Sequence, residues 1–238
     1  MLACRSTLLL CFILYFKTSV GQDVDQHQAA GNITSVYTSN LGLNARLYNG
    51  PEYLDYSNTV KLGFPYFDSK NYQVGSLVFD SIFYPGLQLR LDLVNDYLMI
   101  LHPLSFVSMQ LRNETISAFT IGSHQFFHLG TDSGSAIKNG FYERVYNGNT
   151  SVYVKHRKVL EDRNKSDDIY QEAVLVDTYF VLKNNEFYQV KSMKGLLAIF
   201  KGKEKTIQQH LRQQKIRFKK NNQLAIVQSA TFYDQLTK

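Results

Sequence analysis

The sequence predicts an α+β protein in which β-structure dominates: a curled antiparallel meander, barrel-like or two-layered, followed by short C-terminal helices. Two observations lead to this prediction. From about residue 59 to residue 190 the chain consists of short segments rich in Tyr, Phe, Val and Thr, separated by polar turns. After residue 190 the apolar residues recur at helical spacing instead.

Residues 1–21 have the layout of a secretory signal peptide. Arg5 supplies the positive charge, residues 7–16 form an apolar run, and small residues precede a cleavage site before Gln22. The apolar run is too short for a stable membrane span, and no other stretch approaches the roughly 18 apolar residues that a span needs. We therefore expect the mature chain to have no transmembrane span; an uncleaved N-terminal anchor is the alternative.

Both cysteines, Cys4 and Cys11, lie within this signal segment. The mature chain would then have neither a disulfide nor a thiolate metal ligand. An exported chain without disulfides must be held together by its core, for which some 200 residues suffice. Residues 22–45 are small and polar with no sustained period, and we predict a flexible leader there.

Residues 46–190 are predicted to form the antiparallel β domain. Its clearest strand spans residues 87–93 (LQLRLDL), in which the leucines share one face and Gln88, Arg90 and Asp92 share the other. This two-residue period is typical of a half-buried strand. About ten such strands are too many for a flat sheet with one exposed face, so the sheet should curl, close into a barrel or form two layers.

Two pentapeptides nearly repeat, RLYNG at residues 46–50 and RVYNG at residues 144–148. In the second, Asn147-Gly148 separates two strand segments and predicts a tight hairpin with positive φ angles. In the first, Pro51 follows and restricts pairing. We interpret the recurrence as turn architecture, with a faded internal duplication as the alternative.

Residues 191–238 are predicted to form a basic helical segment packed on the β domain, with Ser192 and an asparagine at 221 or 222 as helix caps and Gly202 as a helix end. Residues 191–220 contain ten Lys or Arg and a single acidic residue, Glu204. This charge could contact an anionic envelope surface, at roughly 1 kcal/mol per basic side chain near a charged bilayer. The candidate contact residues are Lys201, Lys203, Lys205, Arg212, Lys215, Arg217, Lys219 and Lys220.

The alternative is that these lysines lie on solvated helix faces beside the acidic β domain. Nucleic acid is not an expected partner of an exported chain, although Tyr and Phe are available for stacking.

His124 and His128 are the candidate metal ligands, because residues four apart share a face of a strand or of a helix. The glutamate of the HExxH motif is missing, since Gln125 follows His124, and no third ligand is evident. Ordinary strand histidines are therefore the preferred interpretation. We find no phosphate-binding loop, dinucleotide fingerprint or Gly-x-Ser-x-Gly elbow, and we expect no cofactor.

The segment from Leu47 to Met99 contains the elements LYNGPEYLDY, GFPYF and GSLVFDSIFYPGLQLRLDLVNDYLMI. In these elements it resembles an uncharacterised family of exported, β-rich proteins of Bacteroidota. Their C-terminal ends are Lys-rich and helical and finish near a Tyr-Asp or Tyr-Asn pair, as Tyr233-Asp234 does here. The resemblance implies the periplasm or cell surface of a Gram-negative bacterium, and it supplies no activity and no catalytic residues.

We therefore expect an exported envelope protein that is not an enzyme. Its curled sheet, rich in Tyr and Phe, would hold an apolar or glycan ligand, and its basic helices would contact an anionic partner. A structural or adhesive envelope component, acting through protein–protein contacts, is the alternative. A hydrolase or metalloenzyme without a recognisable motif is the third possibility, and the sequence leaves the oligomeric state open.

Overall fold

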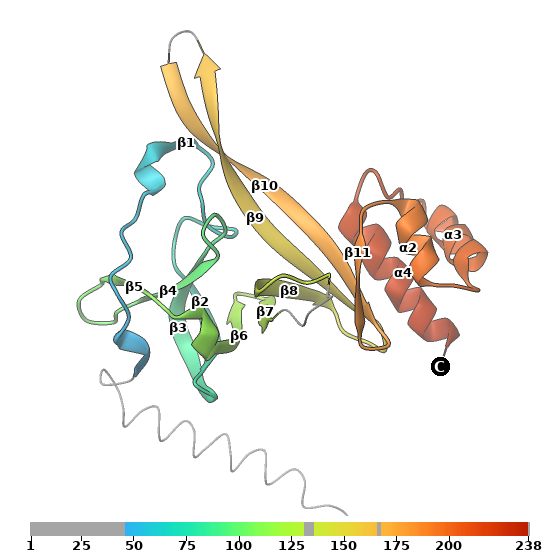
Figure 1. Cartoon of the computed structure of the whole chain (residues 1–238), viewed down its shortest axis with the longest axis horizontal. Helices are drawn as coiled ribbons and strands as arrows, with labels where there is room; N and C mark the ends of the chain where they lie inside the picture. Colours follow the sequence, from blue (N-terminus) through green and yellow to red (C-terminus); the bar gives the residue numbers. More distant parts are fainter. Residues whose placement is uncertain (1–45, 131–135, 166–167, 238) are drawn as a thin grey trace, which may run out of the picture.

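The computed structural model describes residues 46–130, 136–165 and 168–237, so the predicted signal peptide and leader lie outside the described residues. Within the described part, an open sheet of eleven strands is followed by three short C-terminal helices (Figure 1). The predicted class, mainly β with C-terminal helices, is confirmed. The sheet does not close, so the barrel-like variant of the prediction has no enclosed interior.

Two antiparallel meanders make up most of the sheet. The first comprises β2 (Gln73–Phe79), β3 (Ile82–Asp92), β4 (Tyr97–Leu101) and β5 (Ser108–Gln110). The second comprises β6 (Ile116–Ile121), β7 (His124–Leu129), β8 (Gly140–Tyr146), β9 (Ser151–Lys165), β10 (Asp168–Lys183) and β11 (Glu186–Val190). Antiparallel pairing of β2 with β6 joins the two meanders, whereas the short β1 (Val60–Leu62) pairs in parallel with β10. The sheet is therefore mixed rather than wholly antiparallel.

The main core lies inside the curl of the first meander and the strands that follow it. One continuous apolar cluster draws buried side chains from six strands, including Leu77 of β2, Leu89 of β3, Ile100 of β4 and Phe126 of β7. A flat sheet could not bring side chains from so many strands into one cluster, so the sheet must bend around them. The leucine face predicted for residues 87–93 is part of this core.

On the polar face of β3, Gln88 is exposed as the alternation predicts, but Arg90 and Asp92 are not. Asp92 is completely buried and Arg90 is nearly so. The segment between Tyr53 and Tyr66 covers them, and Tyr53, Tyr66 and Met99 form a second apolar cluster on that side. The prediction of a half-buried strand is wrong here, because the pattern of β3 alone carries no information on what packs against its polar side.

Strands β9 and β10, of 15 and 16 residues, form a long hairpin that extends beyond the rest of the sheet (Figure 1). Their register is continuous from Asp168↔Lys165 to Leu182↔Ser151. Near the base of the hairpin, Val152 and Val181 belong to the core beneath the helices. The same two strands thus reach from the helical end of the molecule to the far side of the sheet.

Helices α2 (Met193–Ile199), α3 (Glu204–Gln213) and α4 (Asn222–Leu236) cover the sheet at β8 to β11. The predicted caps are confirmed: Ser192 Oγ accepts a hydrogen bond from the Gly195 N–H, and Asn221 Oδ1 accepts one from the Leu224 N–H. Gly202 has a φ of +83° just after α2, as a helix-ending glycine should. Leu196, Phe200 and Ile226 are among the side chains that these helices bury.

The predicted tight turn at Asn147-Gly148 is wrong in its details. The β8–β9 connection spans residues 147–150, and neither Asn147 nor Gly148 has a positive φ. Glycine is required at 148 for a different reason, because a Cβ atom there would overlap Asp234 Oδ2 and the Tyr146 hydroxyl. Gly50 of the other pentapeptide is also tightly enclosed, since its Cβ would overlap the Gln110 carbonyl oxygen.

Candidate anion-binding site

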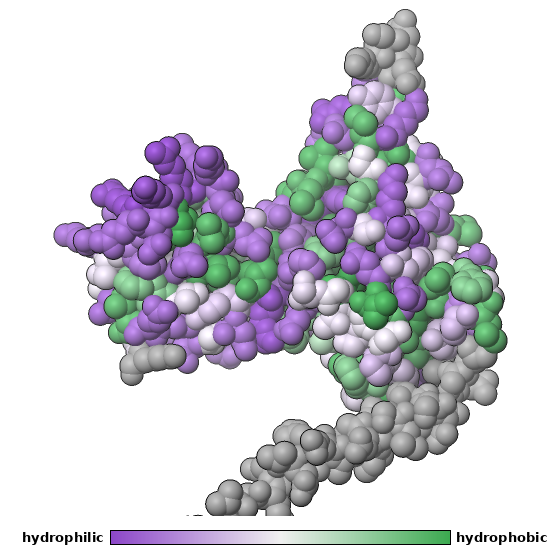
Figure 2. All heavy atoms as spheres, turned by 180° about the vertical axis from the view of Figure 1, so that it is seen from behind, coloured by the Kyte–Doolittle hydropathy of each residue, from purple (hydrophilic) through white to green (hydrophobic). Residues whose placement is uncertain are grey.

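The predicted basic residues lie along one continuous stretch of the helical segment. Two are in the α2–α3 connection, two are on α3, and four are in the α3–α4 connection: Lys201 and Lys203, Lys205 and Arg212, and Lys215, Arg217, Lys219 and Lys220. All of these are exposed except Lys203, which is half-buried. Figure 2 shows hydrophilic side chains gathered over this end of the molecule.

The local fold explains why the basic side chains point outward. On α3, the buried Ile207 and Leu211 occupy the inner face, which leaves Lys205 and Arg212 to the solvent. The α3–α4 connection begins at Lys215, whose φ is +58°, and the Ile216 N–H closes the helix end by donating to the Leu211 carbonyl at 2.9 Å.

Beyond this point the connection alternates between inner and outer positions. Ile216 and Phe218 pack against the helical core, while Arg217, Lys219 and Lys220 are exposed. The apolar side chains thus hold the connection in place, and the charged ones are presented to the solvent.

None of the eight candidate residues forms an ion pair within the described part of the chain. The carboxylates of the sheet pair with cations of the β domain instead, as Asp80 does with Arg46 and Asp96 with Lys155. The helices join the sheet through apolar side chains, through Asp234, and through Lys183 Nζ, which donates to the Ile199 carbonyl. Among the described residues, no basic residue of residues 191–220 takes part in an ion pair there. The charge of this segment is therefore not neutralised by the acidic β domain.

The structure does not bring the two predicted metal ligands together. Both histidines are on β7 and on one face, but Phe126 lies between them, and four strand residues span about 13 Å. His124 Nδ1 is 2.6 Å from Glu143 Oε1, while the ring of His128 packs on Phe141. Within the described residues, no group of three or more metal-ligating side chains is suitably placed for an ion.

A row of ionisable side chains that the sequence did not reveal crosses four neighbouring strands. His124 of β7 contacts Glu143 of β8, whose other oxygen lies 2.7 Å from His156 Nε2 on β9. His156 Nδ1 is in turn 2.7 Å from Asp177 Oδ1 on β10. Phe67 packs against both histidine rings, and the side chain of His124 remains 40% exposed.

The charge states in this row follow from its hydrogen bonds. Burial alone would lower the pKa of His156, but hydrogen bonds to Asp177 and Glu143 outweigh it and raise that pKa to about 9. Burial likewise opposes ionisation of Glu143, yet hydrogen bonds from both histidines lower its pKa. Near neutral pH, His156 is thus an imidazolium between two carboxylates, an ion-paired cross-link between strands. No nucleophilic side chain contacts it in the described residues.

A second buried polar cluster connects parts of the segment from Leu47 to Met99, in which the sequence resemblance lies. Asp92 accepts hydrogen bonds from the hydroxyls of Tyr53 and Tyr56 and from the Asn95 side chain. Its carboxylate is fully satisfied and completely buried, so this cluster holds the segment from Tyr53 onward against β3. The sequence signal for it was the density of Tyr and Asp in those segments.

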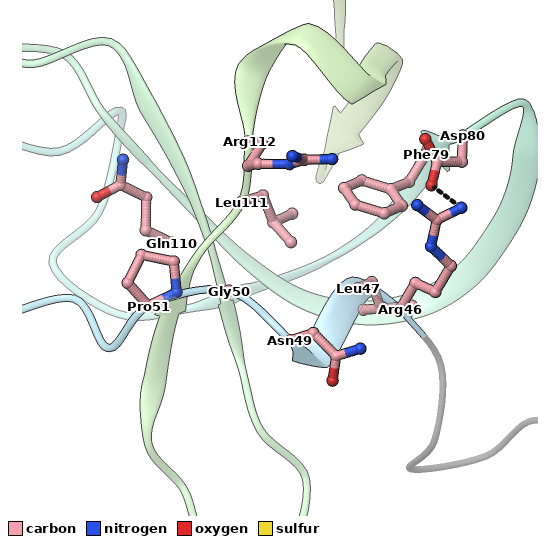
Figure 3. A pocket seen from close by; sticks show the side chains of 10 residues that line it. All are labelled: Arg46, Leu47, Asn49, Gly50, Pro51, Phe79, Asp80, Gln110, Leu111 and Arg112. Atoms are coloured by element: carbon pink, nitrogen blue, oxygen red, sulfur yellow. Dashed lines mark ion pairs between the residues drawn. The ribbon is translucent and has the colours of Figure 1, made fainter.

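Two of the cavities have linings that combine acidic and basic side chains. The smaller, of about 280 Å³, lies between residues 46–51, Phe79-Asp80 and residues 110–112 (Figure 3). The ion pair between Arg46 and Asp80, 3.0 Å long, spans its edge. The larger, of about 490 Å³, lies where β8, β9, β10 and β11 meet the β3–β4 turn, and its lining includes Lys155 and Arg157.

Comparisons with protein-family models, with curated proteins and with solved structures find no match for this chain. Among the described residues, no helix combines the length and apolar character that crossing a membrane would require.

Proposed function

We propose that the protein is a non-enzymatic binding protein of a Gram-negative envelope, exported by its signal peptide, and that its basic helical segment contacts an anionic surface. The single observation that carries the proposal is the exposed, unpaired charge of residues 201–220. Eight cations on a folded scaffold create a positive potential that attracts anionic headgroups or polyanions. The resemblance to exported proteins of Bacteroidota supports the location.

The alternative of a solvated helix face next to an acidic domain receives less support. In that arrangement, carboxylates of the β domain would offset the basic residues, whereas Asp80 and Asp96 are engaged by cations of the β domain itself. A carrier with an enclosed apolar interior also receives less support, because the sheet is open. The row centred on His156 supplies ion pairing and no nucleophile within the described residues, so it does not favour an enzyme.

Vesicle sedimentation of the purified full chain tests the proposal. The probes are phosphatidylcholine vesicles with and without about one-third phosphatidylglycerol, in low salt. We expect binding only to the anionic vesicles, with an affinity that falls as salt rises. Replacing Lys219 and Lys220 with Gln should weaken binding by about 30-fold, because each basic residue near the surface contributes about 1 kcal/mol.

A matched control removes the same charge from the β domain. Lys70 and Arg112 are exposed and lie outside the helical segment, and the K70Q/R112Q variant should bind as the wild type does. Lys215 is left unchanged in all variants because its positive φ is sensitive to substitution. Equal losses in both double variants would show that net charge alone matters, and the proposed contact surface would then be abandoned. Equal binding to both kinds of vesicle would also overturn it.

A further inference from the structure

We infer that the cavity of about 490 Å³ between the β3–β4 turn and β8 to β11 is a binding site for a small organic anion that carries hydroxyl groups, such as an acidic monosaccharide. This site is separate from the basic helices and does not depend on the proposed function. Its size lies within the usual range for small-molecule sites. Three observations carry the inference: an excess of positive charge, an incompletely satisfied ammonium group and a mixed polar and aromatic lining.

The charge excess comes from three cations that face one carboxylate. Lys138, Lys155 and Arg157 line the cavity together with Asp96. Asp96 is already engaged, because Lys155 Nζ lies 2.6 Å from its Oδ2. Within the described residues, the side chains of Lys138 and Arg157 have no hydrogen-bond or ion-pair partner. Two positive charges at the cavity are therefore available to an anion.

Lys155 provides the second observation. Its side chain is only 13% exposed, and Nζ donates to Asp96 and to the Phe141 carbonyl, at 2.6 and 3.0 Å. An ammonium group has three N–H donors, and among the described residues only two of them have an oxygen acceptor. Nζ also lies 5.0 Å from the centroid of the Tyr142 ring. Burial lowers the pKa of Lys155, Asp96 counteracts this effect, and the nearby Arg157 lowers the pKa further. An acceptor supplied by a ligand would complete its coordination.

Gly140 leaves room for the ion pair between Asp96 and Lys155. Its φ is +144°, and a Cβ there would overlap both Asp96 Oδ2 and Lys155 Nζ. The ion pair therefore approaches the backbone directly at the start of β8. The position of the Asp96–Lys155 pair is thus fixed against β8 and β9, which preorganises this part of the site, whereas the side chains of Lys138 and Arg157 are exposed.

The rest of the lining suggests the class of ligand. Tyr142 and Phe180, both almost completely buried, form the aromatic floor of the cavity and contact each other edge-to-face with ring centroids 5.6 Å apart. Asn139, Thr178 and Gln189 add neutral hydrogen-bonding groups. An anionic group would bind at Arg157 and Lys138, hydroxyl groups would meet the amides and the threonine, and a ring would lie against the aromatic surface.

Calorimetric titration of the full chain with D-glucuronate and D-galacturonate tests this inference, with D-glucose as the neutral counterpart. We expect at least one of the two acidic sugars to bind and glucose to bind at least tenfold more weakly. The R157Q variant should lose roughly tenfold or more in affinity, because a charge-assisted contact is removed. The exposed Lys70 lines neither of the two cavities described above, so K70Q is the matched control and should bind as the wild type does.

Amide chemical shifts locate the bound sugar. Changes should centre on Tyr142, Lys155 and Phe180. The inference is overturned if neither acidic sugar binds at millimolar concentration, if glucose binds equally well, or if R157Q and K70Q behave alike. It is also overturned if the shifts move at Lys219 and Lys220 instead, since the sugar would then occupy the helical surface. Vesicle binding by the basic helices is measured separately, so failure of either proposal leaves the other standing.

Discussion

Asp234, in the last turn of α4, accepts hydrogen bonds from both the backbone N–H and the hydroxyl of Thr150, and the hydroxyl contact measures 2.7 Å. The two residues are 84 positions apart in the chain. The Tyr146 hydroxyl donates to the same carboxylate at 3.0 Å, and Asp234 is almost completely buried. One carboxylate thus fastens the final helix to the connection between β8 and β9.

Removing this carboxylate should loosen the helical segment. D234A leaves the buried Thr150 N–H without its acceptor and leaves the Thr150 hydroxyl only the longer contact with the Ala230 carbonyl, 3.4 Å away. We expect a loss of roughly 2–4 kcal/mol in the free energy of unfolding. D234N keeps one acceptor oxygen and should lose less. Urea unfolding followed by circular dichroism measures both variants. The exposed Gln235 is the control: if Q235A proved as destabilising as D234A, the hydrogen bonds would not be the cause.

Gly148 should tolerate no side chain. We expect G148A to be destabilised by about 1–3 kcal/mol, because the new methyl group must displace Asp234 or Tyr146. G130A is the matched control, since no described residue lies within 4 Å of a Cβ at that exposed glycine. The cost of G148A should also shrink in a D234A background, where part of the overlap is gone. Strict additivity in this double-mutant cycle would contradict the proposed overlap.

The ion-paired His156 should make stability depend on pH. Its folded pKa of about 9 lies above the ordinary value of 6.5, so its contribution is complete below pH 6.5 and is lost as pH rises through 9. The difference in the free energy of unfolding between wild type and H156Q should therefore decrease by up to about 3 kcal/mol over this window. Urea unfolding at a series of pH values measures this difference.

Two further observations sharpen the pH experiment. Burial lowers the pKa of Lys158 to about 8, which favours the folded state as pH rises, but this effect is common to both chains and cancels in the difference. D177N removes one partner of His156, so its pKa should fall and the loss of stability should begin at lower pH. An NMR titration of the His156 ring reports that pKa directly. A pH-independent difference between wild type and H156Q would rule out the ion-paired state.

The buried tyrosine beside Asp92 should contribute through its hydroxyl. Burial, the charge of Asp92 and its hydrogen bond all raise the pKa of Tyr53, so the phenol stays protonated and donates. We expect Y53F to lose about 1–2 kcal/mol of unfolding free energy, measured in urea. Tyr97, the exposed first residue of β4, is the control, and Y97F should leave the free energy of unfolding nearly unchanged. A Y53F chain as stable as Y97F would assign Tyr53 an apolar role only.

Local patterns in the sequence predicted the fold class, the helix caps and the leucine face of β3, because capping and alternation depend on residues close together in the chain. The burial of Asp92 was not predictable in this way, since Tyr53 and Tyr56 reach it from a segment nearly 40 residues earlier. The role of Gly148 depends likewise on a partner at position 234.

The same distinction between local and distant contacts separates the parts of the candidate sites that could be predicted from those that could not. The basic stretch of residues 201–220 could be found from composition, and the structure adds that its charge is unpaired among the described residues. The cavity lined by Lys138, Lys155 and Arg157 could not be found from composition, because Asp96 and these cations come from separate strands and turns. Contacts between distant segments carry no local period, so a single sequence gives no signal for them.

The β9–β10 hairpin has a consequence for the way the molecule opens. Val152 and Val181 at its base belong to the core beneath the helices, and His156, a few residues along, packs against Phe67 beside the main core. Slowly exchanging backbone amides should therefore continue from β9 and β10 into α4 and the first meander. Exchange in deuterated water should reveal a single cooperative unit with these two strands as its most protected part. Because the hairpin packs in both cores, the helical segment and the curled sheet should unfold together rather than one after the other.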